Sequence, residues 1–110
     1  MARPQKCRMI CSKPRATCFE PKGIRSGEPV VMGYDEYETV RLLDFESFSQ
    51  EQCAARMQVS RPTVTRMYDS TRRKMAEALV GARPLLIEGG DVLVCPAKRP
   101  TDRLINRITG

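Results

Sequence analysis

The stretch Ser49–Met67, SQEQCAARMQVSRPTVTRM, determines the fold that the sequence predicts. Ser49 and Gln52 have the spacing of a capping box, in which two side chains satisfy free N–H groups at the start of a helix. We therefore expect a helix over about residues 50–57. Apolar residues follow at helical spacing, which indicates one buried face on each of two short helices: Cys53, Ala54, Met57, Val64 and Met67.

A tight turn is expected between these two helices. Gln58 falls where such turns take a left-handed backbone conformation, which costs a side chain about 1 kcal/mol relative to glycine. Ser60 is a second N-cap, and Pro62 lies in the first turn of the next helix, where a missing N–H is tolerated. That helix is expected over about residues 61–80. The pattern is typical of a helix-turn-helix, whose second helix enters the major groove of DNA.

Charge is distributed unevenly along the chain, which has a formal net charge of +6. Residues 34–60 carry six acids against two arginines, whereas residues 61–80 carry five Lys or Arg against two acids. Projected at about 100° per residue, the outward side of the second helix carries these residues: Pro62, Thr65, Arg66, Asp69, Arg72 and Arg73. Segregated charge of this kind suits a protein that turns one side toward phosphates.

Composition narrows the class of protein further. The 110 residues predict one small domain with one modest core. No apolar run approaches the roughly 18 residues of a membrane-spanning helix and no signal peptide is recognisable, so we expect a cytoplasmic protein without a membrane partner. The sequence has no His and no recognisable carboxylate pair or Gly-rich phosphate loop, which argues against an enzyme.

Residues 1–33 contain four prolines and seven Lys or Arg. Because proline interrupts helices, we expect an irregular basic arm, anchored in the core by Phe19, that follows the DNA backbone or enters a minor groove. A disordered tail is the alternative.

Four cysteines are candidate ligands for a metal: Cys7, Cys11, Cys18 and Cys95. The first three are spaced C-x3-C-x6-C, whereas metal sites usually contain a closer cysteine pair. We therefore expect reduced thiols and no cofactor. A metal or iron–sulfur site is the alternative, and it would appear as about one equivalent of zinc or iron in the purified protein.

A first helix is expected to begin at Tyr34, with Asp35 and Glu38 as its capping box. With the two helices above, it completes a three-helix domain over residues 34–81. The predicted fold class is therefore mainly α, with an irregular N-terminal arm and a small β-hairpin after the second helix of the helix-turn-helix.

The hairpin is predicted over residues 82–96. Gly89-Gly90 lies between two β-prone runs, which is a common hairpin signal. Because a lone hairpin is marginally stable in water, we expect it to pack on the helices or to pair with a short strand at residues 30–32. Residues 97–110 are expected to form a frayed tail.

A set of short motifs runs through residues 2–90. They are Ala2-Arg3-Pro4, Cys7-Arg8, Asp35-Glu36-Tyr37-Glu38, Arg41-Leu42, Asp44, Gln50-Glu51-Gln52-Cys53-Ala54-Ala55, Met57, Val59-Ser60-Arg61-Pro62-Thr63, Arg66, Lys74, Ala76, Ala78-Leu79 and Ile87-Glu88-Gly89-Gly90. With these motifs the chain resembles a family of uncharacterised prokaryotic proteins predicted to bind DNA, whose helix-turn-helix is similar to region 4 of primary sigma factors. The resemblance implies a three-helix DNA-binding domain and a role in regulating transcription. It also implies which positions read bases: Arg61, Pro62, Thr65 and Arg66.

The function that the sequence predicts is sequence-specific binding of double-stranded DNA by a transcriptional regulator. Arginine bidentate to guanine is the commonest specific contact, so Arg61 and Arg66 are expected to read base edges. A second set is expected to contact phosphates: Ser49, Gln50, Ser60, Arg72, Arg73 and Lys74. Two alternatives use the same helices. One is a cysteine-dependent metal or redox sensor, and the other is a protein–protein module that docks on RNA polymerase. A homodimer is compatible with each.

Overall fold

A computed structural model describes residues 8–10, 13–25, 27–90 and 92–94 of the chain. Its helical elements are α1 (Tyr34–Val40), the π-helical segment η1 (Arg41–Phe45), α2 (Gln50–Met57) and α3 (Arg61–Gly81). Its strands are β1 (Arg8–Ile10), β2 (Cys18–Phe19), β3 (Val30–Met32), β4 (Leu85–Ile87) and β5 (Val92–Val94). The predicted mainly α architecture with three helices is confirmed. No helix within these described ranges is long and apolar enough to cross a membrane.

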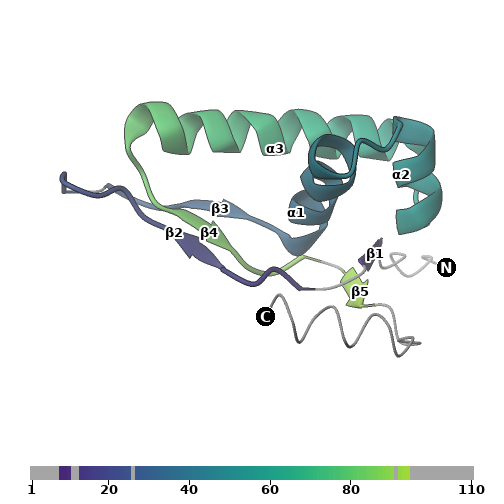
Figure 1. The fold of residues 1–110 in the computed structure, drawn as a ribbon, viewed down its shortest axis with the longest axis horizontal. Helices are drawn as coiled ribbons and strands as arrows, with labels where there is room; N and C mark the ends of the chain where they lie inside the picture. Colours follow the sequence, from purple (N-terminus) through teal and green to yellow (C-terminus); the bar gives the residue numbers. More distant parts are fainter. Residues whose placement is uncertain (1–7, 11–12, 26, 91, 95–110) are drawn as a thin grey trace, which may run out of the picture.

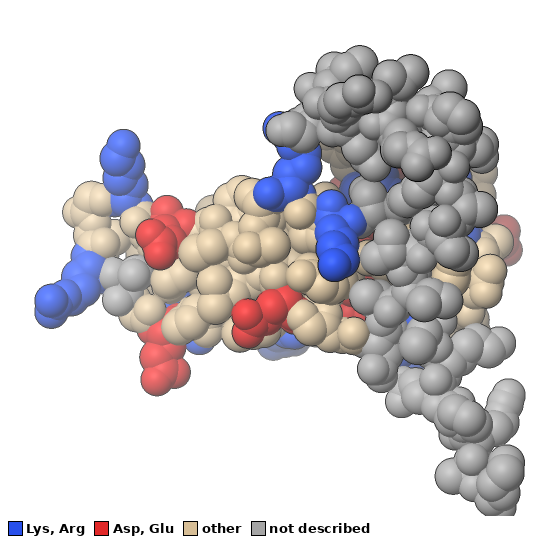
Figure 2. All heavy atoms as spheres, turned by 90° about the horizontal axis from the view of Figure 1, so that it is seen from below, with Lys and Arg blue, Asp and Glu red and all other residues tan. Residues whose placement is uncertain are grey.

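The helix α3 lies along one face of the sheet, and α1 and α2 lie beside its N-terminal half (Figure 1). The sheet face turned away from α3 is mostly uncharged in its described part, with charges of both signs around it (Figure 2). The polar and basic outward side of α3 is therefore on the opposite side of the molecule from the open sheet face.

Local sequence signals determine the ends of α2 as predicted. The Ser49 hydroxyl accepts a hydrogen bond from the backbone N–H of Gln52 at 3.1 Å. The Gln52 side chain accepts one from the Ser49 N–H at 2.9 Å, which completes the capping box. At the other end, Gln58 has φ of +60° and ψ of +47°, which is the left-handed conformation predicted for the turn.

The ends of α3 follow from the same kind of signal. The Ser60 hydroxyl accepts a hydrogen bond from the Thr63 N–H at 3.3 Å, and Pro62 lies in the first turn. The helix ends one residue later than predicted, at Gly81, and Ala82 takes the left-handed C-cap conformation with φ of +53°.

The core joins α2 and α3 to the end of the first helix. Six buried side chains form one cluster: Leu42, Cys53, Ala54, Met57, Val64 and Met67. Five of these six are the apolar residues of Ser49–Met67 whose spacing predicted buried helix faces. Leu42 from η1 is fully buried among them, whereas Phe45 from the same segment is 81% exposed.

The predicted capping box of α1 is wrong by two residues. Gly33 is the N-cap, and its N–H donates to the Glu36 carboxylate at 2.9 Å. A side chain at position 33 would come within 2.6 Å of the Asp35 carboxylate, so only glycine fits there without a shift. Glu38 does not cap the helix, because its carboxylate is buried and pairs with Arg41.

The described part of residues 1–33 is irregular except for the three short strands β1, β2 and β3, of which only β3 was expected. Pro14, Pro21 and Pro29 lie between these strands, where proline removes no hydrogen bond from the sheet. Phe19 is 54% exposed and does not anchor the arm in the core. Ile10, which is 1% exposed, is buried instead.

The predicted hairpin is also wrong, because β4 and β5 belong to different sheets. The strand β4 lies between β2 and β3, antiparallel to β2 and parallel to β3, with Leu85 opposite Val30. The strand β5 pairs in parallel with β1. The predicted pairing with residues 30–32 is thus confirmed. The strands β4 and β5 pair with β2, β3 and β1, not with each other. Residues 97–110, predicted as a frayed tail, lie outside the described ranges.

Candidate nucleic-acid interface

The outward side of α3 presents the residues that helical projection predicted. Pro62, Thr65, Arg66, Asp69, Arg72 and Arg73 are all exposed. Arg66 and Arg73 are seven residues apart, which places them on one side of the helix about 10 Å from each other. Neither forms a hydrogen bond or ion pair with any residue in the described part of the chain. Two guanidinium groups are therefore available to an external anion.

The N-terminal turn of α3 lies against the start of α2. The Thr65 hydroxyl donates to the Gln50 side-chain oxygen at 2.6 Å, which links two predicted contact residues across the two helices. Arg61 lies 3.7 Å from Glu51, but both side chains are more than half exposed. A pair of this kind contributes little to stability and is readily exchanged for another partner. Ser49 and Ser60 cap these two helices, so their hydroxyls have defined positions beside the exposed face.

Arg72 is held beside this face by an aromatic ring. Its guanidinium lies 5.2 Å from the centre of the Tyr68 ring, within cation–π range. The Tyr68 hydroxyl in turn donates to the Asp44 carboxylate at 2.8 Å. This hydrogen bond, with a smaller effect of desolvation, raises the pKa of Tyr68. The phenol therefore stays neutral near neutral pH.

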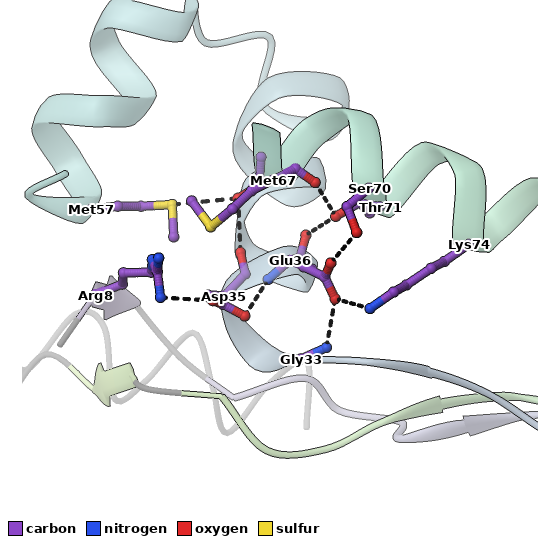
Figure 3. Close-up of polar contacts among 10 residues, drawn as sticks. Arg8, Gly33, Asp35, Glu36, Met57, Met67, Ser70, Thr71 and Lys74 are labelled. Carbon is purple, nitrogen blue, oxygen red and sulfur yellow. Dashed lines mark hydrogen bonds and ion pairs between the residues drawn. The ribbon is translucent and has the colours of Figure 1, made fainter. Parts of the chain in front are cut away.

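Lys74 is not brought together with the other predicted phosphate contacts. Its ammonium group donates to the Glu36 carboxylate at 2.8 Å (Figure 3). The same carboxylate accepts from the Ser70 hydroxyl at 2.6 Å and from the Gly33 N–H at 2.9 Å. Burial by itself raises the pKa of Glu36, but these hydrogen bonds outweigh it and hold that pKa below its usual value. The cluster joins α1 to the middle of α3.

The acids of residues 34–60 all have partners within the chain. The pairs are Asp35 with Arg8 at 3.3 Å, Glu36 with Lys74 at 2.8 Å, Glu38 with Arg41 at 2.9 Å, Asp44 with the Tyr68 hydroxyl at 2.8 Å, Glu46 with Arg41 at 3.1 Å and Glu51 with Arg61 at 3.7 Å. Sequence reasoning identified the acidic block but none of these pairs. Only Glu38 and Arg41 had a local signal, because side chains three residues apart face each other on a helix.

The cysteines provide no described metal centre. Cys18 is exposed and free, and Cys53 is buried in the core. Burial, followed by the charge of Glu38, raises the pKa of Cys53 to about 11, so its thiol stays protonated near neutral pH. No three His, Cys, Asp or Glu residues within the described ranges are grouped to hold a metal ion. The remaining candidates, Cys7, Cys11 and Cys95, lie outside those ranges, so the cysteine prediction stays a prediction.

Comparison with known proteins identifies a family. Residues 1–94 match the family described as "Protein of unknown function DUF134". A UPF0251 protein of Desulfitobacterium hafniense is 45% identical over 97 residues, which cover 86% of this chain and 78% of that protein. A UPF0251 protein of Thermoanaerobacter pseudethanolicus is 43% identical over 96 residues, covering 86% and 81% of the two chains.

A longer relative is similar over almost the whole of this chain. A UPF0251 protein of Chlorobium chlorochromatii is 44% identical over 103 residues, which cover 92% of this chain and 58% of that protein. No solved structure matches. The resemblance to an uncharacterised prokaryotic family is thereby confirmed, and the chain belongs to the DUF134 family.

Proposed function

We propose that the protein binds double-stranded DNA and regulates transcription, with α2, the turn at Gln58 and α3 acting as a helix-turn-helix. The observation that carries this proposal is the outward side of α3, where Arg66 and Arg73 are exposed and without a partner in the described part of the chain. Every acid of residues 34–60 is paired within the chain, so Asp69 is the one carboxylate on the outward side of α3 beside these two groups. Phosphates and base edges are the partners that such arginines suit.

Base reading is assigned to the first two turns of α3. Arg66 is five residues from the start of the helix, about 7.5 Å along its axis. In this position it reaches the floor of a groove that the helix enters by its N-terminus, and a bidentate contact with guanine fits its guanidinium. Arg61 can make the same kind of contact with a base once it leaves its exposed ion pair with Glu51. Thr65 already donates its hydroxyl proton to Gln50, so its methyl group is the part that we assign to a thymine methyl.

Phosphate contacts are assigned around this reading face. Ser60 caps the N-terminus of α3, where free N–H groups and the helix dipole attract anions. Ser49 and Gln50 lie at the N-terminus of α2, as its N-cap and its first residue. Arg72 and Arg73 lie further along α3, beyond the depth at which a straight helix follows the bases. We leave Lys74 out of this set, because its ammonium group pairs with Glu36.

The test begins with selection of bound sequences from a random duplex pool. Titrations then compare the selected duplex with a random one at several salt concentrations. Arg66→Ala should cost about 1–3 kcal/mol on the selected duplex and little on the random one. Arg73→Ala is the matched control on the same side of the helix. It should weaken both duplexes similarly and lower the salt dependence by about one ion.

Two outcomes would count against the proposal. Equal loss on both duplexes for Arg66→Ala means that Arg66 contacts phosphate, so base reading lies elsewhere. An affinity for DNA that is weak and insensitive to salt removes DNA binding altogether.

A second function, docking on a protein of the transcription machinery, is favoured by one observation. Phe45 is 81% exposed beside a hollow of about 440 Å³ lined also by Tyr37, Val40, Arg41 and Asp44. An exposed aromatic ring beside a hollow is typical of protein interfaces. If this is the main function, Phe45→Ala abolishes regulation in cells while Arg66→Ala preserves it.

A further inference from the structure

A groove of about 570 Å³ lies between the C-terminal half of α3 and the strands β2 and β4. Its apolar lining consists of Phe19, Ile24, Met75, Ala78, Leu79 and Leu85. Three of these side chains are among the most exposed apolar groups of the described chain, at 54% for Phe19, 60% for Ile24 and 80% for Leu79. Apolar side chains gathered at one hollow, at these exposures, mark a binding surface.

The strand register explains why the groove is open. Phe19, Leu85 and Val30 are paired across the three strands and so share one face of the sheet. Val30, on the β3 side, is only 5% exposed beneath α3. Burial of the row decreases from β3 to β2: Leu85 in β4 is half-buried, and Phe19 in β2 is more than half exposed. The described residues therefore leave the β2 side of this apolar row only partly covered.

The strand β2 is also a free edge. It pairs with β4 on one side, and no strand within the described ranges pairs with its other side. Unpaired N–H and C=O groups at a sheet edge are a template for another chain. The groove and the open edge thus adjoin, and they offer apolar and backbone contacts to the same partner.

The charges around the groove balance. Of the charged residues that line it, Glu20 matches Lys22, and Arg83 is 3.9 Å from Glu77, which lies outside the lining. A surface with this balance suits a copy of itself, because a two-fold axis places the same patch on both sides, where a net charge would repel. The outward side of α3 has the opposite property, with Arg66, Arg72 and Arg73 against Asp69 alone.

We propose that a second copy of this chain covers the groove, so that the protein forms a two-fold dimer through α3 and β2. Phe19 and Leu79 of each copy then become buried at the centre of the interface. The surface lies near the C-terminal end of a 21-residue helix, about 30 Å long, whose N-terminal turns carry Arg66. If the proposed DNA binding holds, this arrangement leaves both N-terminal halves free for two half-sites.

The test measures the mass of the full chain in solution without DNA, by light scattering and sedimentation over a wide range of micromolar concentrations. Leu79→Glu should weaken self-association by at least 10-fold, on the order expected for a central apolar contact. Val80→Glu is the matched control, since Val80 is the next residue, is 89% exposed and does not line the groove. It should leave the dimer unchanged.

A second variant reports on the groove itself. The chain contains no tryptophan, so Phe19→Trp introduces a single fluorescent probe at the open edge. Its emission should shift to shorter wavelength over the same concentration range as the change in mass. Adding Leu79→Glu should prevent that shift.

Three results overturn the dimer proposal. They are a monomer at every concentration, a dimer that Leu79→Glu does not weaken, and an emission already shifted in the monomer, which means that one chain covers its own groove. Because DNA is absent from this experiment, its failure is distinct from failure of DNA binding. A monomer that still prefers the selected duplex overturns the dimer alone.

Discussion

Two charged regions of this molecule use their charge differently. The acids of residues 34–60 each contact a partner within the chain, from the buried pair of Glu38 and Arg41 to the exposed pair of Glu51 and Arg61. On the outward side of α3, Arg66 and Arg73 form no hydrogen bond or ion pair with any described residue. The first region holds the helices together, whereas the second leaves its charge for something outside.

The difference shows that the count of charges in a segment does not predict their role. The acidic block is conspicuous in the sequence, yet five of its six carboxylates pair with cations from β1, η1 and α3, and Asp44 accepts a hydrogen bond from Tyr68. What distinguishes Arg66 and Arg73 is that neither has an ion-pair or hydrogen-bond partner among the described residues. Variants that remove one group at a time should therefore separate stability from binding.

Removal of Glu38 should have the largest effect on stability. Its side chain is fully buried and holds Arg41 through two hydrogen bonds of 2.9 Å. Loss of one partner from a buried pair costs about 3–5 kcal/mol, so Glu38→Gln should lower the free energy of unfolding by that amount in urea titrations. The control is Glu46→Gln, which removes a 42% exposed partner of the same arginine and should cost about 0–1 kcal/mol. Equal costs for the two variants would contradict the assignment of Glu38 to the folded core.

Glu36→Gln should cost less, about 1–3 kcal/mol at pH 7, because the Glu36 side chain is 13% exposed whereas that of Glu38 is fully buried. The pKa of Glu36 is held below its usual value, so its carboxylate stabilises the fold above the unfolded pKa of about 4.3. This contribution is lost as pH falls through the lower folded pKa. We expect the stability of the natural chain to decline below about pH 5. The variant should show a shallower decline in thermal melts, and an unchanged pH dependence would exclude this role.

Gln58→Gly should raise stability slightly, by up to about 1 kcal/mol, because glycine adopts the left-handed turn without strain. DNA affinity should stay the same. Gln58 lies between the two helices but belongs to neither charged region, so this variant separates turn geometry from charge. A lower melting temperature would show that the Gln58 side chain contributes contacts of its own.

Arg66→Ala and Arg73→Ala should have the smallest effects on stability, within about 0.5 kcal/mol of the natural chain. Both side chains are exposed, and neither has an ion-pair or hydrogen-bond partner among the described residues, so their removal breaks no such interaction. The measurement is the urea midpoint, compared with the losses of DNA affinity expected of the same proteins. A loss of stability near that of Glu38→Gln would mean that these arginines stabilise the fold, and it would contradict the proposed difference between the two regions.

The elements that the sequence predicts well are those with local causes. The capping box of Ser49 and Gln52, the N-cap at Ser60 and the turn at Gln58 act within four residues, and α2 and α3 begin as predicted. The outward side of α3 follows from helical spacing alone. For α1 the same kind of pattern predicted a capping box at Asp35 and Glu38, but the N-cap is Gly33. A Cβ atom at position 33 would lie too close to the Asp35 carboxylate, and this depends on the folded structure, not on residue spacing.

The sheet and the polar cluster have distant causes that local patterns do not contain. Gly89 and Gly90 do have positive φ, the conformation that favours glycine, but they do not close a hairpin. The strands on either side find partners elsewhere in the chain. Pairing of Leu85–Ile87 with β3 was expected because a lone hairpin is marginally stable, but no local feature indicates β2. Similarly, Lys74 follows the arginines of α3 in sequence but meets Glu36, which is 38 residues away. This pairing of Lys74 depends on how α1 packs against α3.

The position of β4 at the centre of its sheet has a consequence for the order of folding. Val30 pairs with Leu85, 55 residues later, and Arg8 pairs with Val92, 84 residues later. Contacts this distant require closure of a long loop, whereas the helices form from neighbours. During synthesis the N-terminal part leaves the ribosome first, so we expect α1, α2 and α3 to pack while β2 and β3 still lack their shared partner. We therefore expect the sheet to form last. Its central strand β4 is synthesised after α3, and only then can it pair with β2 and β3, which were synthesised much earlier.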